Sequence, residues 1–357
     1  MPDPLHVWSS CARYGIPNGM RLALITVAPF ETVSGASFYH RHLLAAWRDR
    51  GDEAEVVALA DKVPPDFADR FDNDTAIVVE GAAFEAAEAA IPALQARGAV
   101  ALIHHPTALE PGTPEPRRRQ LKALEIAVLP GFTRVIAASE PIARRLSAEF
   151  GVINDHLYVL APGTDQQPRR IFDPTARCGG PCTLLSLGTL TFRKGHDVLL
   201  KALATLTDLD WHLILAGEPR DAAYAADLAV LIEQLGLRSR VECHGAVEGG
   251  ALEAIWARAD IFALATRFEG FGMAIAEAMA RGLPVAITDG GAAGNLIALG
   301  VGVVAPVDDV AQLAKAMRRL IFSPALRAEM GGCAWTHART LPEWPMQAAA
   351  LRGIVQR

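Results

Sequence analysis

Short apolar runs alternate with segments of helical periodicity along most of this chain of 357 residues. Apolar runs of strand length that are separated by helices are typical of a parallel sheet covered by helices on both faces. In the first half we expect strands at 21–28, 55–59, 75–79, 100–104, 135–138 and 158–160, and helices at 38–50 and 82–97. In the second half we expect strands at 183–187, 211–216, 240–244, 261–264, 284–288 and 302–305, and helices at 195–206, 222–235, 250–258, 273–281, 310–322 and 325–337. The pattern therefore predicts an α/β fold.

One segment interrupts this alternation and divides the chain. Residues 166–181 are rich in Pro, Arg, Gln and Gly and have no periodicity, which is typical of a linker. We therefore expect two doubly wound, Rossmann-like domains at 20–165 and 182–334, with parallel sheets that face each other across a cleft. Ligands of such domains bind at the carboxyl ends of the strands. Residues 1–19 have no clear pattern, and we expect them to form an N-terminal extension.

Charge and composition argue against several classes of protein. The formal net charge of −6 and the pI of about 5.9 argue against a general nucleic-acid binder, which would be basic. The five cysteines are odd in number and widely spaced, as expected for reduced thiols in the cytoplasm. No apolar stretch approaches the roughly 18 to 20 residues of a membrane-spanning helix, and we expect no signal peptide. These features favour a cytoplasmic protein.

Residues 268–285 are the most informative part of the sequence. Glu269 and Glu277 flank a Gly-Phe-Gly turn and the first turns of an expected helix. Gly270 and Gly272 allow the backbone to approach a ligand closely, and free amides at a helix start bind phosphate. One hydrogen-bond acceptor on each side of a phosphate site matches the order of groups in a nucleotide sugar: sugar, diphosphate, ribose. The alternative is an amphipathic helix with two surface glutamates.

A second segment, Gly188 to Gly195, follows the first strand of the second half and opens a helix. It contains Arg193 and Lys194, which can neutralise a diphosphate at the end of a strand. The alternative is a solvated basic pair.

Together, these two segments resemble the E-x7-E and G-x4-[RK]-K-G motifs of retaining glycosyltransferases of the GT-B fold, in glycosyltransferase family 4 (glycosyl transferases group 1). The resemblance covers nearly the whole chain after residue 20 and is more specific in the second half. It implies that Glu277 holds the ribose of the donor and that Glu269 contacts the transferred sugar. It also implies that Arg193 and Lys194 stabilise the leaving nucleoside diphosphate, so that neither a metal nor a cofactor is required.

The resemblance implies further site residues at the ends of other strands. His104 and His105 end a strand where the family has a histidine near the donor sugar. We favour His105 as the catalytic residue and place His104 and Glu110 on the acceptor side; the alternative is a histidine packed at a strand end. His244 would lie near the base of the nucleotide. The remaining donor-binding residues that we expect are Gly35, Gly188, Gly217, Gly270, Phe271, Gly272 and Met273.

The sequence departs from the family pattern at three places. Many members have two adjacent glycines where this chain has Gly35, and a second glycine where it has Glu218. A glutamate is common in the family where this chain has Gly294 and Asn295, so the identity of the donor sugar stays open.

The expected function is that of a retaining, metal-independent hexosyltransferase, with a UDP-sugar favoured over GDP-mannose as donor. The acceptor stays open among a lipid-linked glycan, a polysaccharide and a small metabolite. The Arg117–Arg119 run would suit an anionic acceptor or a membrane surface on the cytoplasmic face, and a solvated helix face is the alternative. Residues 335–357 are expected to pack back on the first domain, as the last helix of the family does. The rival functions are a nucleotide-sugar epimerase or phosphorylase on the same scaffold and a non-catalytic sugar-nucleotide-binding protein.

Overall fold

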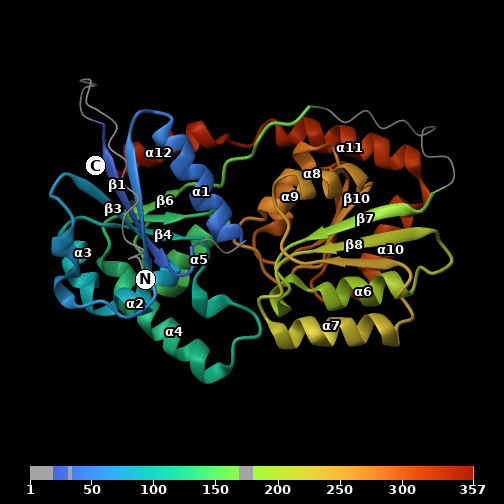
Figure 1. Ribbon diagram of the computed structural model, residues 1–357, viewed down its shortest axis with the longest axis horizontal. Coiled ribbons are helices and arrows are strands. Elements are labelled where there is room, and N and C mark those ends of the chain that lie inside the picture. Colours follow the sequence, from blue (N-terminus) through green and yellow to red (C-terminus); the bar gives the residue numbers. More distant parts are fainter. Residues whose placement is uncertain (1–18, 31–33, 169–179, 357) are drawn as a thin grey trace, which may run out of the picture.

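The computed structural model describes residues 19–30, 34–168 and 180–356. The N-terminal extension expected at 1–19 and most of the linker expected at 166–181 lie outside the described residues. The described chain forms two six-stranded parallel sheets that lie side by side along the long axis of the molecule (Figure 1). This confirms the α/β architecture of two doubly wound sheets that the sequence predicts.

The first sheet has the strand order β2-β1-β3-β4-β5-β6, and every neighbouring pair is parallel. Its strands are β1 (Arg21–Val27), β2 (Glu53–Leu59), β3 (Thr75–Glu80), β4 (Val100–Ile103), β5 (Val135–Ala137) and β6 (Leu157–Val159). Ala23 and Ile25 of β1 pack in one hydrophobic cluster, and Leu22 and Leu24 pack in another on the opposite face. Because both faces of the sheet are buried, its central strands are continuous apolar runs.

Helices cover both faces of this sheet. They are α1 (Gly35–Arg48), α2 (Phe84–Ala87), α3 (Ile91–Ala96), α4 (Glu115–Val128) and α5 (Glu140–Phe150). Helix α1 begins before the expected residue 38 because the side chain of Ser34 caps it, accepting a hydrogen bond from the amide of Ser37.

The single helix expected at 82–97 is wrong. The chain there forms two short helices, α2 and α3, preceded by the 3₁₀ turns Gly81–Ala83 and Glu88–Ala90. Pro92 lies in the first turn of α3. A proline has no amide hydrogen to donate, so it is tolerated at a helix start and interrupts a helix elsewhere.

The second sheet has the order β12-β11-β10-β7-β8-β9, again with parallel neighbours. Its strands are β7 (Cys182–Leu187), β8 (Trp211–Ala216), β9 (Val241–His244), β10 (Ile261–Leu264), β11 (Val285–Thr288) and β12 (Gly302–Ala305). Its helices are α6 (His196–Ala204), α7 (Ala222–Gln234), α8 (Gly249–Arg258), α9 (Met273–Ala280), α10 (Val310–Phe322) and α11 (Pro324–Ala338). All of these elements lie close to their expected positions.

The last helix, α12 (Trp344–Val355), leaves the second half and packs against α1 of the first (Figure 1). The ring centroids of Trp344 and Tyr39 are 5.6 Å apart. The boundary expected at residue 335 falls inside α11, so the segment that returns to the first half is α12. Among the described residues, no helix has the length and apolar character needed to cross a membrane.

Candidate functional site

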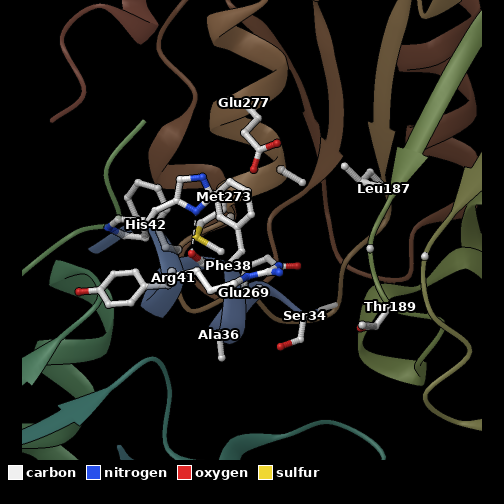
Figure 2. Close-up of a pocket in the computed structure, with 18 of the residues that line it drawn as sticks. Ser34, Ala36, Phe38, Arg41, His42, Leu187, Thr189, Glu269, Met273 and Glu277 are labelled. Carbon is white, nitrogen blue, oxygen red and sulfur yellow. Dashed lines mark hydrogen bonds between the residues drawn. The ribbon is translucent and has the colours of Figure 1, made fainter. Parts of the chain in front are cut away.

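A cavity of about 690 Å³ lies between the two halves of the chain (Figure 2). Its wall includes residues that follow strands of both sheets, such as His104 after β4 and Gly188 after β7. The cavity therefore lies at the carboxyl ends of the strands, where open parallel sheets bind ligands. The expected site residues that line it are Gly35, His104, His105, Gly188, Arg193, Lys194, Gly217, Glu269, Gly270, Phe271, Gly272, Met273 and Glu277.

The loop before α9 is packed closely against the first half of the chain. A Cβ atom added to Gly270 would lie 2.1 Å from the carbonyl oxygen of His104. Ser139, two residues after β5, donates a hydrogen bond of 2.6 Å to the carbonyl of Gly270. Gly272 has a φ of 109°, in the region that favours glycine, and it starts α9. These contacts place the start of α9 opposite the end of β4.

Glu269 is a buried, ionised carboxylate. Its Oε1 atom accepts a hydrogen bond from Lys194 Nζ at 2.6 Å and lies 3.3 Å from a guanidinium nitrogen of Arg193. Thr266 Oγ1 donates to the same oxygen at 3.2 Å. Burial alone would raise the pKa of Glu269, but Lys194 and Arg193 outweigh it and lower that pKa to about 2.

Arg193 connects this carboxylate to the first half of the chain. Its Nε atom donates to Glu110 Oε1 at 3.0 Å. The other oxygen of Glu110 lies 2.8 Å from His105 Nε2. Glu110 itself does not line the cavity. It contacts His105 and Arg193, which do line it. The residues expected on the two sides of the cleft are therefore joined in one charged network.

Glu277 has a different environment on the same segment. It lies on α9 with its carboxyl group directed into the cavity (Figure 2). No hydrogen bond to its side chain comes from the residues that the structure describes. Burial raises the pKa of Glu277 to about 7, an effect that Arg281 opposes and Asp165 and Glu253 reinforce. Glu277 therefore has acceptor capacity available for a ligand.

The loop after β8 approaches the loop after β7 through backbone atoms. Gly217 has a φ of 155°, and a Cβ atom added there would lie 1.9 Å from the carbonyl oxygen of Gly188. Glu218, which occupies the position of the second family glycine, also lines the cavity. Its Oε2 atom is buried and has no partner among the described residues.

His244 lies outside the wall of the cavity. It ends β9, and its Nε2 atom lies 2.6 Å from Glu242 Oε1. Residues two apart on a strand project from the same face, which brings Glu242 and His244 together. The contact between His244 and a nucleotide base that the resemblance suggests has no support in this arrangement.

The first half supplies wall residues that the sequence did not single out. Phe38 and His42, one turn apart on α1, stack with ring centroids 3.8 Å apart. The ring centroids of Trp344 and His42 are 5.4 Å apart. Arg41 also lines the cavity and makes an ion pair of 2.7 Å with Glu248 of the other half. The spacing of Gly35, Phe38 and His42 along α1 is the signal that could have revealed this face.

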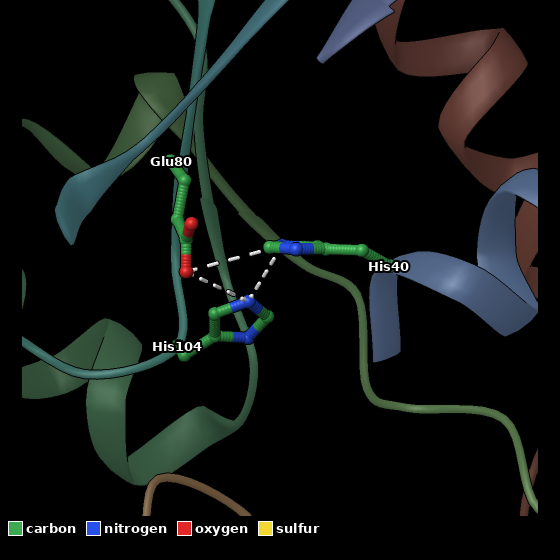
Figure 3. A group of neighbouring side chains, drawn as sticks. All are labelled: His40, Glu80 and His104. Atoms are coloured by element: carbon green, nitrogen blue, oxygen red, sulfur yellow. Dashed lines mark hydrogen bonds and ion pairs between the residues drawn. The ribbon is translucent and has the colours of Figure 1, made fainter. Parts of the chain in front are cut away.

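His104 also belongs to a buried cluster that the sequence did not reveal. Its Nε2 atom lies 3.0 Å from His40 Nε2 and 3.7 Å from Glu80 Oε1 (Figure 3). Burial lowers the pKa of both His40 and His104 to about 3, so both rings are neutral near pH 7.

The Arg117–Arg119 run lies on α4 and is paired with carboxylates. Arg117 makes an ion pair of 2.5 Å with Glu85, and both Arg118 and Arg119 contact Glu115. These pairs favour a solvated helix face over a binding site for an anionic surface.

The sequence has known relatives. Residues 169–334 match the family described as glycosyl transferases group 1. Among the relatives is a D-inositol 3-phosphate glycosyltransferase of Arthrobacter sp. (strain FB24), which is 32% identical over 237 residues. The alignment covers 63% of this chain and 56% of the relative, so the chain spans little more than half the length of that protein.

Solved structures resemble nearly the whole chain. Sucrose-phosphate synthase from Thermosynechococcus elongatus has a TM-score of 0.79 at 20% identity, covering 94% of this chain and 98% of that protein. Anabaena Alr3699/HepE, solved in complex with UDP and glucose, has a TM-score of 0.74 at 18% identity and covers 94% and 99%. These similarities confirm the GT-B fold.

Proposed function

We propose that this chain is a glycosyltransferase that takes a sugar from a nucleoside-diphosphate sugar. The observation that carries the proposal is the pair of carboxylates in one cavity: Glu269 held by Lys194 and Arg193, and Glu277 without a donor among the described residues. The family of residues 169–334 supports the same reaction class.

The donor would lie along the loop before α9 and its first turns. Glu277 would accept hydrogen bonds from the ribose hydroxyls and Glu269 from a hydroxyl of the transferred sugar. Lys194 has three donors and Arg193 has five, so both can hold Glu269 and still bind phosphate oxygens. These two cations and the amides near Gly272 would hold the diphosphate, and we propose that transfer requires no divalent metal ion.

Transfer would occur with retention of the anomeric configuration. The bond from the anomeric carbon to the diphosphate oxygen breaks, and its electron pair stays with the diphosphate. The acceptor hydroxyl oxygen bonds to the anomeric carbon on the same face, and its proton passes to the leaving phosphate oxygen. His105, whose ring Glu110 orients at 2.8 Å, would bind the sugar or the acceptor beside that bond.

The relatives support particular donors and acceptors. Anabaena Alr3699/HepE was solved with UDP and glucose, which favours a UDP-sugar over GDP-mannose. The names D-inositol 3-phosphate glycosyltransferase and sucrose-phosphate synthase favour a small phosphorylated acceptor over a polysaccharide or a lipid-linked glycan. Arg41 and His42, on the first-half wall of the cavity, would meet such an acceptor.

Product analysis tests this function. The protein would be incubated with UDP-glucose, UDP-N-acetylglucosamine or GDP-mannose, with and without a set of phosphorylated polyols. We expect release of nucleoside diphosphate and a product whose anomeric proton, seen by NMR, keeps the donor configuration. An isomerised nucleotide sugar would instead identify an epimerase. Tight donor binding without turnover would identify a binding protein.

A further inference from the structure

His40, Glu80 and His104 meet beside the proposed donor cleft, although they are far apart in the sequence. His40 comes from α1, Glu80 ends β3, and His104 follows β4 (Figure 3). His40 Nε2 lies 3.0 Å from His104 Nε2 and 3.9 Å from Glu80 Oε1, and His104 Nε2 lies 3.7 Å from the same oxygen. One possible ligand atom from each of the three side chains therefore lies close to the other two.

We propose that His40, Glu80 and His104 bind a transition-metal ion, with zinc the best fit. In the plane of the three ligand atoms, the point equidistant from them lies about 2.1 Å from each, which matches the bond lengths of zinc to histidine and carboxylate. Two imidazoles and one carboxylate also form a donor set that suits zinc and iron better than magnesium or calcium.

The surroundings of Glu80 support a cation at this centre. His40 and Glu80 are only 1% and 4% exposed. A buried carboxylate is costly unless a cation compensates it. Among the described residues, its ion-pair contacts are the two histidines and include no lysine or arginine. A metal ion would supply the missing charge.

A second contact fixes the carboxylate in position. Thr26 Oγ1 donates a hydrogen bond to Glu80 Oε2, which leaves Oε1 directed at the two histidines. Ligands of protein-bound metals are commonly oriented by such outer contacts.

His104 lines the cavity, so an ion can reach the cluster from there. Three protein ligands leave a fourth position for water or a ligand oxygen. This ion would be separate from the donor diphosphate, whose counterions are Arg193 and Lys194.

The chain contains a natural control for this site. His212, Glu242 and His244 form a second group of two histidines and a glutamate, with distances of 3.3 Å and 2.6 Å from the histidines to the carboxylate. There, Arg258 donates to both oxygens of Glu242 at 3.0 Å and 2.5 Å. That carboxylate already has its cation, so we expect no metal at this second group.

Metal titration tests the proposal. The full chain, without a histidine tag, would be stripped with a chelator and titrated with zinc by calorimetry in the absence of any nucleotide sugar. Cobalt(II) absorption would report the coordination geometry. We expect one equivalent of zinc and the visible bands of a nitrogen–oxygen cobalt site. His40→Ala and Glu80→Gln should each weaken zinc binding at least 100-fold, and Thr26→Val about 10- to 100-fold.

The control His212→Ala should bind zinc as the wild type does. Circular dichroism would verify that each variant is folded. If His40→Ala and Glu80→Gln do not fold, the comparison is made with Thr26→Val. Absence of stoichiometric zinc, or equal affinity in wild type, His40→Ala and Thr26→Val, would overturn the proposal. Because no donor is present, this outcome is independent of whether the chain transfers sugar.

Discussion

At the scale of single residues, Glu269 and Glu277 belong to one motif but have opposite electrostatic environments. Glu269 is held by Lys194 and Arg193, which lower its pKa to about 2 against the effect of burial. Glu277 has no such cation at hydrogen-bond distance among the described residues, and burial raises its pKa to about 7. Environments that separate the pKa values of two carboxyl groups are typical of sites where the two have different roles.

Donor affinity should therefore depend on pH through Glu277. Above about pH 7 its carboxylate is ionised and can accept from both ribose hydroxyls, whereas below that pH it is protonated. The dissociation constant for a UDP-sugar should rise about tenfold from pH 8 to pH 6, since one pKa unit corresponds to a factor of ten. Calorimetry of wild type and Glu277→Gln would measure this. A constant affinity in the wild type, or the same slope in the variant, would contradict the role of Glu277.

Lys194 should act on the departing diphosphate. Removing its charge leaves developing negative charge without one of its partners, and we expect Lys194→Ala to lower kcat about 100- to 1,000-fold. Lys201→Ala is the matched control, because Lys201 is half-exposed and, within the described part of the chain, pairs with Asp197 alone, on its own helix at 3.3 Å. Steady-state kinetics of Lys194→Ala and Lys201→Ala would measure kcat and KM for each variant. A raised KM with unchanged kcat would show that Lys194 binds ground state and transition state equally.

The sequence predicted the site residues that lie in contiguous motifs and missed those that do not. Glu269 to Met273 and Gly188 to Gly195 are short segments in which residue types and spacing indicate phosphate and hydroxyl binding. His40 and Glu80 lie far from His104 in the sequence, inside otherwise apolar or amphipathic elements. The pairing of β3 with β4 brings Glu80 and His104 together, and the packing of α1 brings His40 to them.

At the scale of elements, the Gly270 loop of the second half packs closely against the end of β4 in the first half. A Cβ atom on Gly270 would lie 2.1 Å from a backbone oxygen, so the loop would have to move. We expect Gly270→Ala to reduce the free energy of unfolding by about 1–3 kcal/mol and kcat/KM about 100-fold. Gly250→Ala is the control, because Gly250 lies on α8 and, outside its own stretch of helix, no described residue comes within 4 Å of an added Cβ. It should be neutral or slightly stabilising. Equal behaviour of the two variants in urea unfolding and kinetics would contradict this account.

Strands were easier to predict than helices for a physical reason. Strands buried on both faces, such as β1 and β10, are continuous apolar runs whatever their neighbours are. The helix expected at 82–97 failed because alanine-rich periodicity continues through 3₁₀ turns whose position depends on Pro92 and on packing. Helix α5 was not expected, although Ser139 caps its start and Gly151 ends it in a left-handed conformation.

At the scale of the whole molecule, α12 joins the two halves a second time, beyond the segment around residues 166–181. Trp344 begins this helix, is 4% exposed, and packs against Tyr39 while it lines the cavity. This return could be inferred only from the family resemblance. An amphipathic helix near the end of a chain does not indicate which surface it will cover.

Trp344 should therefore contribute strongly to stability. We expect Trp344→Ala to lower the free energy of unfolding of the first half by about 3–5 kcal/mol, the usual cost for a large buried aromatic side chain. Met346→Ala, on the same helix but 63% exposed, should change it by less than about 0.5 kcal/mol. Urea unfolding, followed by far-ultraviolet circular dichroism rather than by tryptophan fluorescence, would compare the two variants. A similar midpoint for both variants would show that α12 does not stabilise the first half.

The cavity between the halves should bind a nucleotide sugar along the Glu269–Glu277 segment. Calorimetry at pH 8 with UDP-, GDP- and ADP-sugars tests it directly. We predict that one nucleotide binds selectively and that Glu277→Ala weakens it about 10- to 100-fold, the cost of losing hydrogen bonds to a charged group. The exposed Glu233→Ala should bind as the wild type does. Binding of no nucleotide sugar, or equal affinity in wild type and Glu277→Ala, would contradict the claim.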